Sequence, residues 1–163
     1  MELLDVYDNE GKKTGRIVER DTYKENLSKD EHIGVAQIFI ENDKGDFLIE
    51  ESAKTTGFKY LPVSGHIISG ETPKEAIIRE AKEEIGLDIS NEDVKDVGSF
   101  IIDRPVRFIF YLKKDIDLTT LKLQPEEVEN VSYKSATEMM YLIEKGLMHP
   151  VHRDIVPKVL KLK

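Results

Sequence analysis

The sequence predicts an α/β protein, and three observations indicate this class. β-rich segments separated by Gly, Pro, Asn and Asp recur along most of the chain. A capped amphipathic helix interrupts them near the middle of the chain. The 163 residues suit one core that needs no disulfide, and the chain contains no cysteine. We therefore expect a single domain over residues 1–163 with an N-terminal β-hairpin.

Two hairpins are predicted in the first part of the chain. Their strands are residues 3–7 with 14–19 and residues 32–41 with 47–51. The first turn contains Gly11, and the second turn, residues 42–46, carries the stronger turn signal. Polar residues 21–29 predict a connection between the hairpins. A short segment, residues 60–63, then leads to Gly65.

A helix with defined ends is predicted after residue 72. Thr72 is suited to the N-cap, Pro73 to the first helical position and Glu75 to a capping box. Gly86 predicts the end of the helix. One sector of the helix is apolar, which is typical of a helix packed on a sheet. The apolar residues are Ile77, Ile78, Ala81 and Ile85.

The rest of the chain predicts further strands and two helices. The strands are residues 94–102, 106–113 and 128–134. Pro105 excludes one continuous central strand across the first two of them. Residues 136–145 have apolar side chains at helical spacing. Residues 152–160 predict a final helix in which Pro157 produces a kink or a new turn.

The composition restricts the partners of the protein. The net charge of -8 disfavours long nucleic acids, because affinity for a phosphate backbone comes from clustered Lys and Arg. No apolar stretch is long enough to span a bilayer, and no basic segment followed by an apolar run opens the chain. We therefore expect a cytoplasmic protein with no membrane partner. A bound cation can still reverse the local charge and admit a phosphorylated small molecule.

Three carboxylates share one side of the predicted helix. Glu80, Glu83 and Glu84 fall within about a third of its circumference, because positions three and four apart stack on one side. Like charges at this spacing repel, and a divalent cation would offset the repulsion. Carboxylate oxygens suit Mg²⁺ or Mn²⁺. The competing interpretation is a solvated acidic face balanced by Lys74, Arg79 and Lys82.

These carboxylates belong to a longer pattern that resembles the signature of the Nudix hydrolase family. The pattern reads Gly65-x5-Glu71-x7-Arg79-Glu80-Ala81-x-Glu83-Glu84-x-Gly86-Leu87, and every specified position is filled. The resemblance implies an α/β/α sandwich with a mixed β-sheet. It also implies metal-dependent attack of water on a phosphoanhydride (pyrophosphate) bond of a small phosphorylated metabolite, a nucleoside diphosphate derivative.

The resemblance also implies roles for the matched residues. Glu80 and Glu84 would be the principal metal ligands, and Glu83 would assist them. Arg79 would orient a glutamate, and Glu71 would support the loop or a water on the metal. The general base is left open: it is either Glu80 or an acidic residue on a later loop, where Glu126 and Glu127 are the candidates. The candidate substrate-binding residues are Gly65, His66, Arg104 and Arg107. Phe58 and Tyr60 are expected to pack in the core.

Two other functions are weighed against hydrolysis. Both hairpins and the run Val63-Ser64-Gly65-His66 resemble the branch of the family that includes type I isopentenyl diphosphate isomerase. That enzyme uses a cysteine where this chain has Ser64, and a hydroxyl is a far poorer acid-base group than a thiol. A non-catalytic nucleotide-binding domain typically loses carboxylates that this chain retains. The sequence therefore favours a hydrolase, and a homodimer is compatible with the resemblance.

Overall fold

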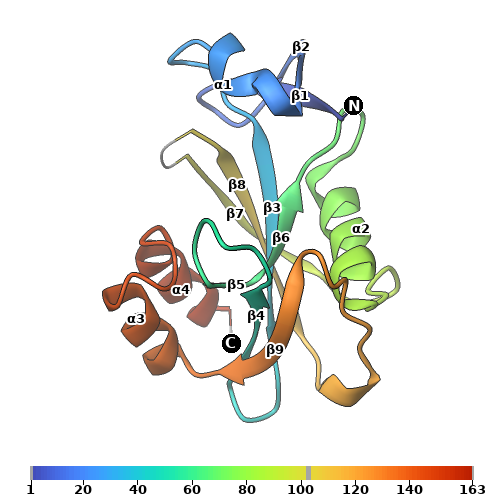
Figure 1. Cartoon of the computed structure of the whole chain (residues 1–163), viewed down its shortest axis with the longest axis vertical. Coiled ribbons are helices and arrows are strands. Elements are labelled where there is room, and N and C mark those ends of the chain that lie inside the picture. Colours follow the sequence, from blue (N-terminus) through green and yellow to red (C-terminus); the bar gives the residue numbers. More distant parts are fainter. Residues whose placement is uncertain (1, 102–103, 163) are drawn as a thin grey trace.

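The computed structural model describes residues 2–101 and 104–162 and contains a seven-stranded mixed sheet with helices on both faces (Figure 1). The strands are β3 (Gly34–Glu41), β4 (Phe47–Ser52), β5 (Tyr60–Leu61), β6 (Val63–His66), β7 (Lys95–Ile101), β8 (Val106–Lys113) and β9 (Val128–Lys134). They follow the order β5-β4-β3-β8-β7, with β6 beside β3 and β9 beside β4. Strands β3 and β8 run parallel, and the other described pairings are antiparallel. The predicted mixed sheet is confirmed.

The side-chain alternation of the central strands separates two cores. Helix α2 (Pro73–Ile85) packs on one face against Ile38 and Leu48, whereas helices α3 (Ala136–Glu144) and α4 (His152–Leu160) pack on the other face against Phe39 and Ile49. Successive residues of a strand point to opposite faces, so β3 and β4 each contribute to both cores. The result is the three-layer sandwich seen in Figure 1.

The strand and helix predictions hold in most places and differ in four. Residues 21–29, predicted as a connection, contain the short turns η1 (Arg20–Thr22) and α1 (Tyr23–Asn26). The segment 60–63 divides between β5 and β6, and a further turn, η2 (Leu118–Thr120), precedes β9. Pro157 lies inside α4, which continues through it. Residue 102, the predicted end of a strand, and residue 103 lie outside the described residues.

The N-terminal hairpin, β1 (Leu3–Tyr7) and β2 (Lys13–Glu19), is attached to the turn that precedes α2. The Asp5 carboxylate accepts hydrogen bonds from the Ser69 hydroxyl at 3.0 Å and the Gly70 amide at 2.9 Å, and it lies 2.9 Å from Lys13 Nζ. Burial alone would raise the pKa of Asp5, but these partners lower it. The hairpin therefore holds the loop that leads into the helix.

None of the helices within residues 2–101 and 104–162 combines the length and the apolar character needed to cross a membrane.

Candidate active site

The acidic helix α2 has the ends that its sequence predicts. The Thr72 hydroxyl accepts a hydrogen bond from the Glu75 amide at 3.1 Å, and the Thr72 amide donates to the Glu75 carboxylate at 2.9 Å. Gly86 takes the left-handed conformation, with φ of +70°, at the C-terminal end. These caps fix where the helix begins and ends. Which of its carboxylates face the sheet then depends on the rotation of the helix about its axis.

A cavity of about 450 Å³ opens between α2, β4 and β6. Acidic side chains dominate its wall, and three cationic side chains also reach it. The acidic residues are Glu2, Glu50, Glu80, Glu83, Glu84 and Glu127, and the cationic residues are Arg20, Lys54 and Arg79. The sequence shows no basic residue on β4, so the positive charges at this cavity come from the N-terminal segment, the loop after β4 and α2 itself.

Arg79 connects the loop, the helix and β6 through one guanidinium group. It donates two hydrogen bonds to Glu71, at 2.7 and 3.0 Å, and others to Glu80 at 2.7 Å and Glu83 at 3.1 Å. A further bond of 3.1 Å reaches the backbone carbonyl of His66. Hydrogen bonds to Glu71 chiefly raise the pKa of Arg79 further above its usual range. The planar guanidinium thus orients carboxylates from two segments, as its place in the motif predicts.

Gly65 is required by the position of the Glu80 carboxylate. A Cβ atom on residue 65 would lie 2.2 Å from Glu80 Cδ and 2.5 Å from each carboxylate oxygen. Residue 65 is opposite Ala36 in the pairing of β6 with β3, so the sheet holds its backbone in place. The first glycine of the motif therefore makes room for a side chain of the helix one layer away.

We expect Gly65→Ala to force the Glu80 carboxylate out of its position. The overpacking should lower the free energy of unfolding by about 1–3 kcal/mol. Urea denaturation of Gly65→Ala, Glu80→Ala and the double variant measures this effect. If the clash is the cause, the penalty of Gly65→Ala shrinks in the Glu80→Ala background, because the two residues are coupled. An undiminished penalty in the double variant would mean that another contact excludes the methyl group.

Glu84 is buried against a second carboxylate that sequence analysis did not single out. Glu84 and Glu50 are exposed by only 8% and 2%, and they share a side-chain hydrogen bond. Burial is the main cause that raises the pKa of both groups, and their mutual repulsion raises that of Glu50 further. Glu84 Oε1 and Glu50 Oε2 have no hydrogen-bond partner among the described residues. This pair is the most strongly perturbed acidic group at the cavity.

The sequence contains a signal that would have pointed to Glu50. The apolar run that precedes this residue places Leu48 in the core under α2, so a residue two positions later faces the same helix. A charged residue at such a position has to face a polar group, and α2 presents Glu84 there.

The three predicted metal ligands of α2 do not share one environment. Glu84 is buried, the Glu80 side chain is 13% exposed and bonded to Arg79, and the Glu83 side chain is 52% exposed. Burial raises the pKa of Glu80, and Arg79 opposes that shift. Within the described part of the chain, no three His, Cys, Asp or Glu side chains already form a metal-binding group. The ligand assignment therefore stays a prediction.

Two of the predicted substrate-binding residues, Gly65 and His66, line the cavity, whereas Arg104 and Arg107 are not among its lining residues. Burial, and then the charge of Arg20, lowers the pKa of His66 to about 4, so its imidazole is neutral at pH 7. Arg104 donates to the backbone carbonyls of Ser28 and Leu27, in the segment between α1 and β3. A substrate contact from Arg104 or Arg107 stays a prediction that this arrangement does not favour.

Four other residues named in the sequence analysis lie in different places. Glu127 lines the cavity, with its carboxylate 3.1 Å from Lys54 Nζ, whereas Glu126 is not among the lining residues. Phe58, expected in the core, instead lines the cavity with 38% of its surface exposed, and its ring lies 4.9 Å from that of His149. Tyr60 packs against the α3 and α4 core as expected.

Comparisons with known proteins agree with the fold and the motif. The NUDIX domain family matches residues 30–159. An uncharacterized Nudix hydrolase of Listeria innocua, lin0387, is 29% identical over 120 residues, which cover 71% of each chain. The crystal structure of DR0079 from Deinococcus radiodurans superimposes with a TM-score of 0.69 at 21% identity, over 90% of this chain and 91% of that chain.

A nucleotide-related structure is also similar. The Ap4A hydrolase of Caenorhabditis elegans, solved as a binary complex, has a TM-score of 0.52 at 18% identity, over 68% of this chain and 86% of that chain. At these identities the solved structures show the fold alone. None of these similarities selects the isomerase-containing branch. The motif, the mixed-sheet sandwich and the match over residues 30–159 together place this chain in the Nudix family.

Proposed function

We propose that the protein is a metal-dependent hydrolase that cleaves a phosphoanhydride bond of a nucleoside diphosphate derivative. The observation that carries the proposal is the buried carboxylate of Glu84, which faces other carboxylates across a cavity and has an unpartnered oxygen. Burying such a charge is costly unless a cation compensates it. Family membership supports the hydrolase class.

The residues present fit a divalent cation of the magnesium type. The donors at the cavity are carboxylate oxygens, which hard cations prefer, and no thiol exists in the chain. Glu80 and Glu84 would hold the ion, with Glu83 assisting from the exposed edge. When bound, Mg²⁺ or Mn²⁺ would polarise the phosphoryl group and make water more acidic. Arg79 and Glu71 would keep the carboxylates oriented.

The remaining lining residues support a nucleotide-like substrate. Arg20 and Lys54 offer positive charge to phosphate oxygens, and the exposed ring of Phe58 offers a surface on which a base can stack. Neutral His66 can exchange a hydrogen bond with a phosphate or a hydroxyl group. Glu127 is our choice for the general base, since it reaches the cavity and Glu126 does not. The Ap4A hydrolase of Caenorhabditis elegans has a similar fold, which agrees with a nucleotide substrate.

Three expectations from the sequence accompany this proposal. We propose that residues 1–163 act as one domain, since the N-terminal hairpin, outside the family match, bonds to the loop before α2 through Asp5. A cytoplasmic location and a homodimer stay predictions.

A substrate screen tests the proposed function. Purified protein is incubated with nucleoside di- and triphosphates, dinucleoside polyphosphates, nucleotide sugars and isopentenyl diphosphate, with Mg²⁺, with Mn²⁺ or with excess chelator. We expect phosphate-containing products from at least one nucleotide, and none with chelator. Isomerisation of isopentenyl diphosphate without hydrolysis would support the isomerase instead. Binding of a nucleotide without turnover under every metal condition would support the non-catalytic domain.

A further inference from the structure

We propose that Glu50 on β4 is a direct ligand of the divalent cation, and that it completes with Glu84 a binding site formed by sheet and helix. The inference deepens the proposed function and rests on it, because it names a ligand outside the Nudix motif. The motif lies within residues 65–87, so no residue of β4 belongs to it.

The first support is the buried Glu50 carboxylate, one oxygen of which has no partner in the described part of the chain. Glu50 is 2% exposed and lines the cavity, and its Oε2 atom has no hydrogen-bond partner among residues 2–101 and 104–162. The other carboxylate groups that act on it electrostatically are those of Glu84, Glu80 and Glu127. A buried acid on which other acids exert the strongest electrostatic influence is poorly compensated within the protein. A hard cation with oxygen ligands is the chemical species that supplies this compensation.

The second support is the rigidity of the position. At Glu50, strand β4 pairs with Leu61 of β5 on one side and with Val131 of β9 on the other. Leu48, two residues earlier, packs in the core under α2, so the Glu50 side chain is directed at that helix. A ligand on a strand that is paired on both sides is held in place before any ion binds. The backbone at Glu50 therefore does not have to rearrange when the cation is coordinated.

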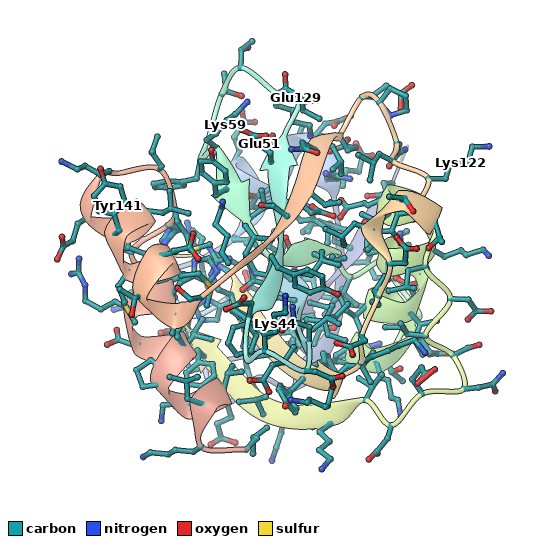
Figure 2. All side chains as sticks on the ribbon, turned by 90° about the horizontal axis from the view of Figure 1, so that it is seen from below. Lys44, Glu51, Lys59, Lys122, Glu129 and Tyr141 are labelled. Carbon is teal, nitrogen blue, oxygen red and sulfur yellow. The ribbon has the colours of Figure 1, made fainter. Side chains whose placement is uncertain are left out.

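Glu51 provides a matched control on the same strand. It is the next residue, carries the same side chain, and accepts a hydrogen bond from the Tyr60 hydroxyl at 3.1 Å. It is not among the residues that line the cavity. Figure 2 shows Glu51 beside Lys59 and Glu129, on the side away from α2. Glu51→Gln therefore makes the same chemical replacement on β4 without touching the proposed site.

The experiment compares Mn²⁺ binding by wild-type protein, Glu50→Gln, Glu51→Gln and Glu84→Gln. Free Mn²⁺ is measured by electron paramagnetic resonance, and the thermal midpoint is recorded with and without the ion. We expect Glu50→Gln to weaken Mn²⁺ affinity at least as much as the roughly 10- to 100-fold losses found for outer-shell partners. We also expect it to reduce the gain in thermal midpoint that Mn²⁺ gives to the wild type. Glu51→Gln should bind Mn²⁺ like the wild type.

The outcomes separate this inference from the proposed function. Wild-type affinity in Glu50→Gln, combined with a loss in Glu84→Gln, would overturn the role of Glu50 and leave the proposed function standing. Unchanged affinity in Glu84→Gln would overturn the proposed metal site itself. The amide introduced by Glu50→Gln can still donate to Glu84, so a role limited to that hydrogen bond predicts no loss of Mn²⁺ affinity.

A second measurement does not depend on the folding of any variant. Wild-type crystals soaked in Mn²⁺ and measured for anomalous scattering locate the ion directly. An anomalous peak within coordination distance of a Glu50 oxygen supports the inference. A peak bound by α2 alone, with Glu50 outside the coordination shell, would overturn it even if Glu50→Gln weakens binding through its lost charge.

Discussion

Replacing Glu84 by Gln is expected to abolish turnover while the fold is retained. The change removes the charge of the most buried carboxylate of α2 with almost no change of shape. A cation contributes several kcal/mol to such reactions, so we expect kcat to fall by about a thousandfold or more, at about 1.36 kcal/mol per factor of ten. Steady-state kinetics with the substrate found in the screen measures the effect, and circular dichroism checks the fold.

The same variant should make the metal-free protein more stable. Burial chiefly raises the pKa of Glu84, from 4.5 to about 8, so the folded state holds a proton that the unfolded state releases in this range. The stability of the metal-free wild type therefore falls as the pH rises from about 4.5 towards 8. Glu84→Gln should weaken this dependence. Urea denaturation at several pH values, with chelator present, measures it.

Glu144→Gln is the matched control for both measurements. Glu144 is an exposed residue at the end of α3, away from the cavity. Its replacement should leave kcat and the pH dependence of stability unchanged. Near-normal turnover in Glu84→Gln would contradict the assignment of this carboxylate to the metal site.

Replacing Arg79 by Lys should have the next largest effect. The guanidinium forms five hydrogen bonds to three carboxylates and the carbonyl of His66, and an ammonium group offers one point of positive charge with three donors. Glu71 and Glu80 would lose their common partner. We expect both kcat and Mn²⁺ affinity to fall by about 10- to 100-fold, as for other groups that orient ligands.

Kinetics and Mn²⁺ titration of Arg79→Lys measure this loss, and Arg153→Lys serves as the control on the exposed side of α4. A positioning role predicts that Arg79→Lys changes Mn²⁺ affinity as well as kcat. If Arg79→Lys has the kcat and the Mn²⁺ affinity of the wild type, the positive charge alone accounts for the role of residue 79. The planar geometry of the guanidinium would then be irrelevant.

Much of the fold could be predicted because its signals are local. The ends of α2 follow from Thr72, Pro73 and Gly86, whose preferences depend on the backbone of one turn. The hairpins and the later strands follow from alternation and turn residues. The short turns η1 and α1 were missed because elements of three or four residues have no periodicity to detect.

The candidate site could be predicted only in part. The spacing of the motif identified Arg79 and its carboxylate partners, and the structure shows that Arg79 bonds to Glu71, Glu80 and Glu83. It did not distinguish buried Glu84 from Glu83, whose side chain is half exposed. Helical spacing places three residues on one side of a helix, but the burial of each side chain depends on what packs against that side.

By itself the sequence determined the family, the class of fold and the limits of the acidic helix. Each of these depends on residue spacing and backbone preference along one stretch of chain. Only the tertiary structure decided that Glu50 faces Glu84 and that Arg20 and Phe58 reach the cavity. These contacts join segments far apart in the sequence, and they depend on strand register and on the rotation of α2 over the sheet, which no local pattern records.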